Sequence, residues 1–206
     1  MMTTANKITI VRILLVPFFA YELVRFLQTG AAIHRWLALG LFLLAAIGDG
    51  VDGFIARRFH QKTELGAILD PLADKLLLVL GLLILSLHNQ GGIPVIPLWL
   101  TITVLARDIM LVLLLILVAC LVGRGSVRPH LTGKTATVLQ MTCIVWVLVG
   151  LSGRWLPYLA AAATFFTAIS GIIYLRAGIA ILRGNAKEER GNAKEEERIP
   201  QSPFSS

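Results

Sequence analysis

The amino-acid sequence predicts an all-α membrane protein with six transmembrane helices and a polar cavity that opens to the cytoplasm. Two observations indicate a membrane protein: 56% of the 206 residues are hydrophobic and only 15% are charged, whereas soluble domains carry roughly 25% charged residues. Several apolar runs also reach the about 20 residues that a helix needs to cross the hydrocarbon core. A third observation, a group of four aspartates where two of these runs meet, predicts the cavity.

Six apolar spans follow one another along the chain. They are predicted at residues 8–27, 36–57, 66–87, 93–122, 131–151 and 155–182. The fourth is longer than a bilayer requires, so it is expected to tilt or to lie only partly in lipid. No small-residue cleavage site follows the first apolar run, so no cleavable signal peptide is expected. Together the spans define a membrane domain of residues 1–183.

Lysine and arginine gather on one side of these spans. The cations on that side are Lys7, Arg12, Arg57, Arg58, Lys62, Arg124, Arg128, Lys134, Arg183 and Lys187. The opposite side has only Arg35 and Arg154, with Arg25 near a helix end. The positive-inside rule therefore predicts a multi-pass protein of the inner (cytoplasmic) membrane, with both termini and the loop 57–66 in the cytoplasm.

The chain carries a net charge of +7, from 19 Lys and Arg against 12 Asp and Glu. In a membrane protein this excess indicates contact with anionic lipid head groups or phosphate substrates. A nucleic-acid partner is not expected, because the basic residues are scattered over short loops and form no basic domain.

The C-terminal residues 184–206 differ from the rest. They contain a near-duplicate, GNAKEER at 184–190 and GNAKEEER at 191–198. A short charged repeat cannot bury a core, so a disordered or fraying helical tail is expected.

The second span ends in DGVDGFIARR and the third begins with GAILDPLADK. On a helix, Asp49 and Asp52 share a face because they are three residues apart, and Asp70 and Asp74 share a face because they are four apart. The short connection between the two spans makes the helices antiparallel neighbours. The two acidic faces can therefore converge. Helix caps or loop charges would explain one or two of these acids, but not four.

Four neighbouring carboxylates raise one another's pKa and need compensation to stay ionised together. Hard divalent cations supply it, and an all-oxygen site suits Mg²⁺ or Mn²⁺. Two such ions about 4 Å apart can activate an attacking oxygen and stabilise a leaving phosphate oxygen. The glycines and Ala56 between the aspartates remove bulk where a ligand must approach closely.

The pattern D-x₂-D-G-x₂-A-R-x₈-G-x₃-D-x₃-D is met from Asp49 to Asp74. It resembles the signature of the class I CDP-alcohol phosphatidyltransferase family. The segment NKITIVR at residues 6–12 also resembles the N-x-[LI]-T-x-x-R segment that often opens these proteins. With the six spans, the similarity covers residues 6–182.

The resemblance implies a function for each residue of the pattern. Asp49, Asp52, Asp70 and Asp74 would hold two divalent ions, and Asp74 would also be the catalytic general base on the acceptor hydroxyl. The implied nucleotide-binding residues are Asp52, Gly53, Ala56, Arg57 and Gly66, with Arg57 on the phosphates. The implied reaction is attack by an alcohol on CDP-diacylglycerol with release of CMP, catalysed by a homodimer.

The acceptor alcohol is less determined. Arg107, inside the fourth span, either binds a phosphate on the acceptor or forms an ion pair with Asp108 or a neighbouring helix. Lys134 is a second candidate for acceptor binding, or a lysine that extends to the interface. The segments ELGAILDPLADK and GKTATVLQM resemble the phosphatidylglycerophosphate synthase branch, which implies glycerol 3-phosphate as acceptor.

Two alternatives stay open. ARDIMLV and IPVIPLW resemble eukaryotic-type cardiolipin synthases, which use phosphatidylglycerol, although those often have Ser-Lys where this chain has Gly133-Lys134. From another class, a small transporter could use the aspartates as a cation or proton site. Transporters often contain inverted repeats, and the two halves of this sequence show none.

Overall fold

A computed structural model of the chain describes the backbone of residues 4–59, 64–88, 93–122 and 131–196, and the side chains of residues 11–48, 75–88, 93–121 and 132–183. Within these ranges the protein is all-helical. The helices are α1 (Thr4–Thr29), α2 (Ala32–Phe59), α3 (Glu64–Leu87), α4 (Leu98–Val122), α5 (Leu131–Val149) and α6 (Leu156–Glu196). The predicted all-α class is therefore confirmed.

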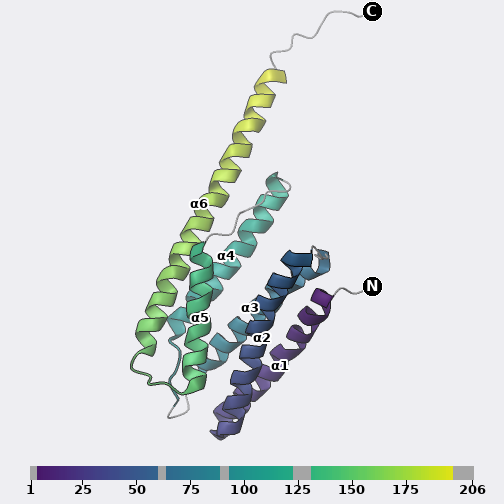
Figure 1. Ribbon diagram of the computed structural model, residues 1–206. Coiled ribbons are helices and arrows are strands. Elements are labelled where there is room, and N and C mark those ends of the chain that lie inside the picture. The colour runs from purple at the N-terminus through teal and green to yellow at the C-terminus, as the bar shows by residue number, and fades with distance from the viewer. Residues whose placement is uncertain (1–3, 60–63, 89–92, 123–130, 197–206) are drawn as a thin grey trace, which may run out of the picture.

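Successive helices run in alternating directions (Figure 1). Helix α1 packs on α2 and α3, α6 packs on α4 and α5, and contacts of α3 with α4 and of α2 and α3 with α5 join the two groups. The start of α1, the end of α2, the start of α3, and the ends of α4 and α6 lie towards the same end of the bundle (Figure 1). The aspartate-bearing parts of α2 and α3 are at this end.

The core between α1, α2, α3 and α5 keeps the aspartate-bearing helices in place. Phe19 of α1 and Phe42 of α2 are almost fully buried, and their rings lie 5.5 Å apart between centroids. Leu82 of α3 and Ile144 of α5 are also fully buried in this cluster. Gly81 has no side chain where the Cδ1 atom of Ile144 lies 2.9 Å from the position that a Cβ would take. Close packing here fixes the spacing of α3 and α5.

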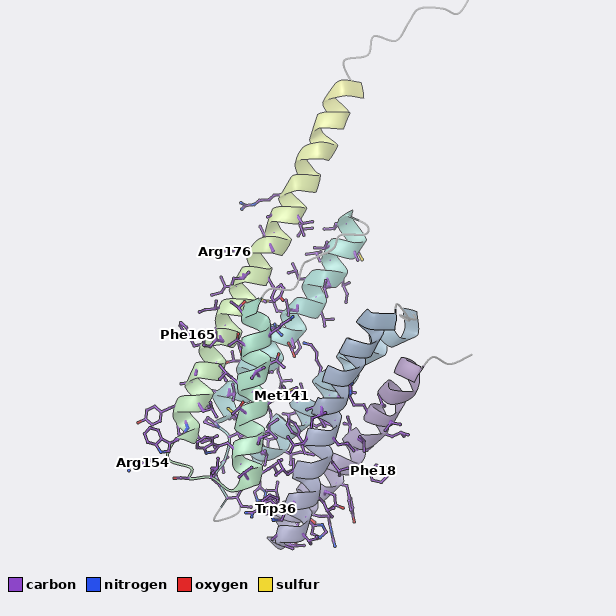
Figure 2. All side chains as sticks on the ribbon, in the orientation of Figure 1. Phe18, Trp36, Met141, Arg154, Phe165 and Arg176 are labelled. Atoms are coloured by element: carbon purple, nitrogen blue, oxygen red, sulfur yellow. The ribbon has the colours of Figure 1, made fainter. Side chains whose placement is uncertain are left out.

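The outer surface is largely apolar. Phe18 and Phe165 lie on opposite outer flanks of the bundle and are exposed (Figure 2). Three segments of the described chain are long and apolar enough to cross a membrane: Leu98–Leu121, Thr132–Val149 and Leu156–Arg183. Shorter apolar helical segments are Ala32–Gly48 and Lys75–Leu87. The structure therefore supports a membrane protein, while six spans and a cavity opening to the cytoplasm stay predictions.

Two predicted boundaries are wrong. Helix α4 begins at Leu98 rather than at residue 93, because the prolines at 94 and 97 lack an N–H group and interrupt the helix. Helix α5 ends at Val149, where Gly150 adopts a φ of 81° that a residue with a side chain rarely takes.

The last helix continues from the membrane domain into the C-terminal segment. The backbone of α6 is helical through residues 184–196, part of the segment that was expected to be disordered or a fraying helix. Ala, Lys, Glu and Arg, which dominate the repeat, are all good helix formers. The continuation of a long membrane helix also avoids the cost of nucleating a new one.

Candidate functional site

The four aspartates of the pattern lie on uninterrupted helix. Helix α2 continues through Asp49 and Asp52 as far as Phe59, and α3 begins at Glu64 and carries Asp70 and Asp74. Helices α2 and α3 contact each other. The helical spacing that the sequence predicted within each pair is therefore present in the backbone.

The side chains of the predicted metal and nucleotide residues lie outside the described ones. These residues are Asp49, Asp52, Gly53, Ala56, Arg57, Gly66, Asp70 and Asp74. Their convergence stays a prediction. Among the side chains that are described, no group of three or more His, Cys, Asp or Glu could hold a metal ion.

The described part of the site begins one residue after Asp74. The Nζ atom of Lys75 donates to the Oδ1 atom of Asp108 on α4 at 2.5 Å. The Asp108 side chain is only 15% exposed. This ion pair joins the helix that carries Asp70 and Asp74 to the helix that carries Arg107.

Arg107 connects α4 to α6. Its Nη1 atom donates to Asp108 Oδ1 at 2.7 Å, and its Nη2 atom donates to Ser170 Oγ at 3.1 Å. The guanidinium carbon Cζ lies 5.6 Å from the ring centroid of Tyr174, within the range of a cation–π contact. The sequence-based alternative of an ion pair between Arg107 and Asp108 is thus present.

The ion pair with Asp108 does not use all the hydrogen-bond donors of Arg107. A guanidinium has five N–H donors in a plane, and the described contacts engage two of them. The Nε atom is buried and has no hydrogen-bond partner among the described residues. A buried donor without a partner costs free energy, so this arginine favours a further acceptor such as a phosphate oxygen.

Helix α5 approaches this guanidinium through a glycine. A Cβ atom on Gly133 would lie 3.2 Å from Arg107 Nη2, 3.3 Å from Ser170 Oγ and 3.4 Å from Tyr174 Oη. Lys134 follows directly and is exposed. The structure therefore brings the first turn of α5, where Lys134 lies, beside Arg107.

A cavity of about 230 Å³ also opens beside Arg107, between α4 and α6. Most of its lining is apolar, including Ala106, Met110 and Ile172. This lining suits a hydrocarbon chain better than a charged head group.

Sequence reasoning missed four residues of this cluster: Lys75, Asp108 as a bridge, Ser170 and Tyr174. Lys75 had a usable signal, because it follows the last aspartate of the pattern. Ser170 and Tyr174 are spaced four apart on one face of α6, a pattern too common in membrane helices to single out.

A model of the family described as CDP-alcohol phosphatidyltransferase matches residues 2–169. The chain belongs to the CDP-alcohol phosphatidyltransferase family. The resemblance seen in the sequence is confirmed, and the chain is a phosphatidyltransferase. The alternative of a small transporter is not supported.

Bacterial relatives extend this family match. A CDP-diacylglycerol–glycerol-3-phosphate 3-phosphatidyltransferase of Shigella flexneri serotype 5b (strain 8401) is 34% identical over 165 residues, which cover 79% of this chain and 85% of the relative. A protein of the same name from Escherichia coli (strain K12) is 35% identical over 164 residues, covering 78% of this chain and 84% of the relative. The chain is therefore similar to these phosphatidyltransferases along most of their length.

Proposed function

We propose that this phosphatidyltransferase transfers the phosphatidyl group of CDP-diacylglycerol to glycerol 3-phosphate and releases CMP, a step of phospholipid biosynthesis. The observation that carries the proposal is the similarity to relatives named for this donor and this acceptor, over 79% of the chain in one of them. The grouping of Lys75, Arg107 and the first turn of α5 agrees with it, because a phosphate-bearing acceptor needs cations beside the reaction centre.

Asp49, Asp52, Asp70 and Asp74 would hold two divalent ions, Mg²⁺ or Mn²⁺. The donor set fits, because carboxylate oxygens are the ligands that these hard cations prefer and each pair of aspartates lies on one continuous helix. When bound, the ions would neutralise charge that develops on the phosphate oxygens.

The nucleotide would lie along the end of α2 and the start of α3. Gly53, Ala56 and Gly66 present little side-chain bulk, which leaves space for the cytidine. Arg57 would pair with the diphosphate, and Asp52 would border both the nucleotide and the ions.

Asp74 would accept the proton of the acceptor hydroxyl. The freed oxygen forms a new bond to the lipid-linked phosphorus, and the bond from that phosphorus to the bridging oxygen of CMP breaks. The electron pair leaves with CMP. Arg107 and Lys134 would hold the phosphate of glycerol 3-phosphate so that its hydroxyl faces Asp74.

Six membrane spans, a multi-pass location in the inner membrane and a site open to the cytoplasm are part of the proposal. The end of α2, the start of α3 and the end of α6 lie towards one end of the bundle (Figure 1), which agrees with a cytoplasmic site and a cytoplasmic C-terminus. A homodimer is proposed on the family resemblance alone.

The test is CMP release from CDP-diacylglycerol by the purified full chain in detergent. One acceptor would be offered at a time, glycerol 3-phosphate or phosphatidylglycerol, with Mg²⁺ or Mn²⁺ present or removed by a chelator. We expect metal-dependent release with glycerol 3-phosphate. Release with phosphatidylglycerol alone would instead make the chain a cardiolipin synthase, and no release with either would contradict the proposal.

A further inference from the structure

Asp108 and Glu22 are the acidic residues whose side chains the structure describes. Glu22 pairs with His34 near the junction of α1 and α2, with 2.6 Å between Oε2 and Nδ1. Asp108 differs because one oxygen, Oδ1, accepts from two full cations, Lys75 at 2.5 Å and Arg107 at 2.7 Å. Asp108 therefore holds together two positive groups that would otherwise repel each other.

The three residues come from two helices and have unequal freedom. Asp108 and Arg107 are 15% and 16% exposed, whereas Lys75 is 44% exposed and reaches Asp108 from the surface of α3. The contact fixes the Nη1 side of the guanidinium, while Ser170 on α6 fixes the Nη2 side. Because both ends are held, the plane of the guanidinium is fixed relative to Lys75 on α3, the residue that follows Asp74.

We infer that Asp108 is a positioning residue for the acceptor. It would orient Arg107 and Lys75 as one cationic surface for the phosphate of the acceptor, at a fixed distance from the predicted base. This inference rests on the proposed function, because it assumes a phosphate-bearing acceptor. It assigns to Asp108 a role that acts through its two cationic neighbours, Lys75 and Arg107.

A simpler role would be charge neutralisation, in which Asp108 only offsets the positive charge of the half-buried Arg107. The two roles predict opposite results for Asp108→Asn, which keeps the volume and removes the charge. If Asp108 only neutralises, the variant raises the local positive potential and attracts anionic glycerol 3-phosphate more strongly, so KM falls. If Asp108 positions the cations, the guanidinium loses its charged anchor and KM rises.

The experiment measures CMP release by the full chain as a function of glycerol 3-phosphate and, separately, of CDP-diacylglycerol. For Asp108→Asn we expect KM for glycerol 3-phosphate to rise about tenfold, and the Ki of inorganic phosphate as a competitor to rise in parallel, because both lose the oriented cations. KM for CDP-diacylglycerol should change less than about twofold. Glu22→Gln, which also removes a carboxylate from a hydrogen-bonded side-chain pair, should change neither constant.

Removal of the Asp108 carboxylate also leaves the half-buried Arg107 without its counter-charge, which can destabilise the fold. Lys75 provides a second test at a more exposed position. Lys75→Met should raise KM for glycerol 3-phosphate about threefold, and Lys75→Arg should restore it, because only a cation can pair with Asp108. A fall in KM for glycerol 3-phosphate, an equal rise for both substrates, or no effect of either variant would overturn the inference. Lack of turnover of glycerol 3-phosphate by the unaltered chain would instead contradict the proposed function.

Discussion

Gly133 lies so close to Arg107 that a methyl group on the glycine would be 3.2 Å from the Nη2 atom of the guanidinium. The same methyl group would be 3.3 Å from Ser170 Oγ, the hydroxyl that accepts a hydrogen bond from Nη2. The glycine thus allows the first turn of α5 to pack on the polar contact between α4 and α6.

Substitution Gly133→Ala is expected to displace Arg107 and to raise KM for glycerol 3-phosphate roughly fivefold, with less effect on KM for CDP-diacylglycerol. The reason is steric, because contacts this short force a neighbour to move. Steady-state CMP release with each substrate varied in turn is the measurement. Gly40→Ala is the matched control, because that helical glycine has nothing within 4 Å of its added Cβ. Equal kinetic effects of the two variants would show that Gly133 has no specific part in acceptor binding.

Asp74→Asn should lower kcat at least about a hundredfold, because a general base contributes about 10²–10⁴ to the rate. The amide has a similar volume, so the thermal unfolding temperature should stay near that of the unaltered chain. Asp49→Asn should lose activity by weakening metal binding, and added Mg²⁺ should restore part of it. Asp74 is also a proposed metal ligand, so some rescue by Mg²⁺ is expected for Asp74→Asn too. If added Mg²⁺ restored Asp74→Asn to the same extent as Asp49→Asn, Asp74 would act only in metal binding and not as the base.

The packing of α4 on α6 depends on another glycine. A Cβ atom on Gly178 would lie 2.5 Å from Leu114 Cδ1 and 2.8 Å from its Cγ, and Leu114 is buried. Gly178→Ala should therefore lower the free energy of unfolding by about 1–3 kcal/mol. The additional change Leu114→Ala should recover part of this loss by making room. A double-mutant cycle by thermal unfolding in detergent would detect the coupling between the two positions. Additive effects would show that residues 114 and 178 do not interact and would contradict this prediction.

A buried hydrogen bond joins α5 to α6 in the same half of the molecule. The Nε2 atom of Gln140 donates to Thr167 Oγ1 at 2.7 Å, and Thr167 Oγ1 donates to Ala163 O at 2.6 Å. Thr167→Val should destabilise the fold by about 1 kcal/mol, because the amide of Gln140 loses its partner. Replacing both residues, with Gln140→Leu and Thr167→Val, should cost less than the single change. A larger loss in the double variant, measured by chemical denaturation, would contradict this account.

Much of the architecture could be predicted from the sequence. Apolar runs separated by charged or glycine- and proline-containing loops predicted six helices, and all six are present. The errors came at helix ends. The prolines at 94 and 97 delay the start of α4, and Gly150, with its positive φ, ends α5 before the predicted residue 151. Hydropathy detects burial in lipid and says little about where hydrogen bonding along a helix stops.

By itself the sequence determined the family, because the aspartate pattern lies within two short stretches and each spacing in it is set by the turn of one helix. Only the tertiary structure revealed that Asp108 bridges Lys75 and Arg107 and that Gly133 packs on the guanidinium. Arg107 and Ser170 are 63 positions apart, and periodicity within a helix carries no information about such a pair. These contacts depend on how α3, α4, α5 and α6 pack, because side chains from separate helices meet only when the helices pack against one another.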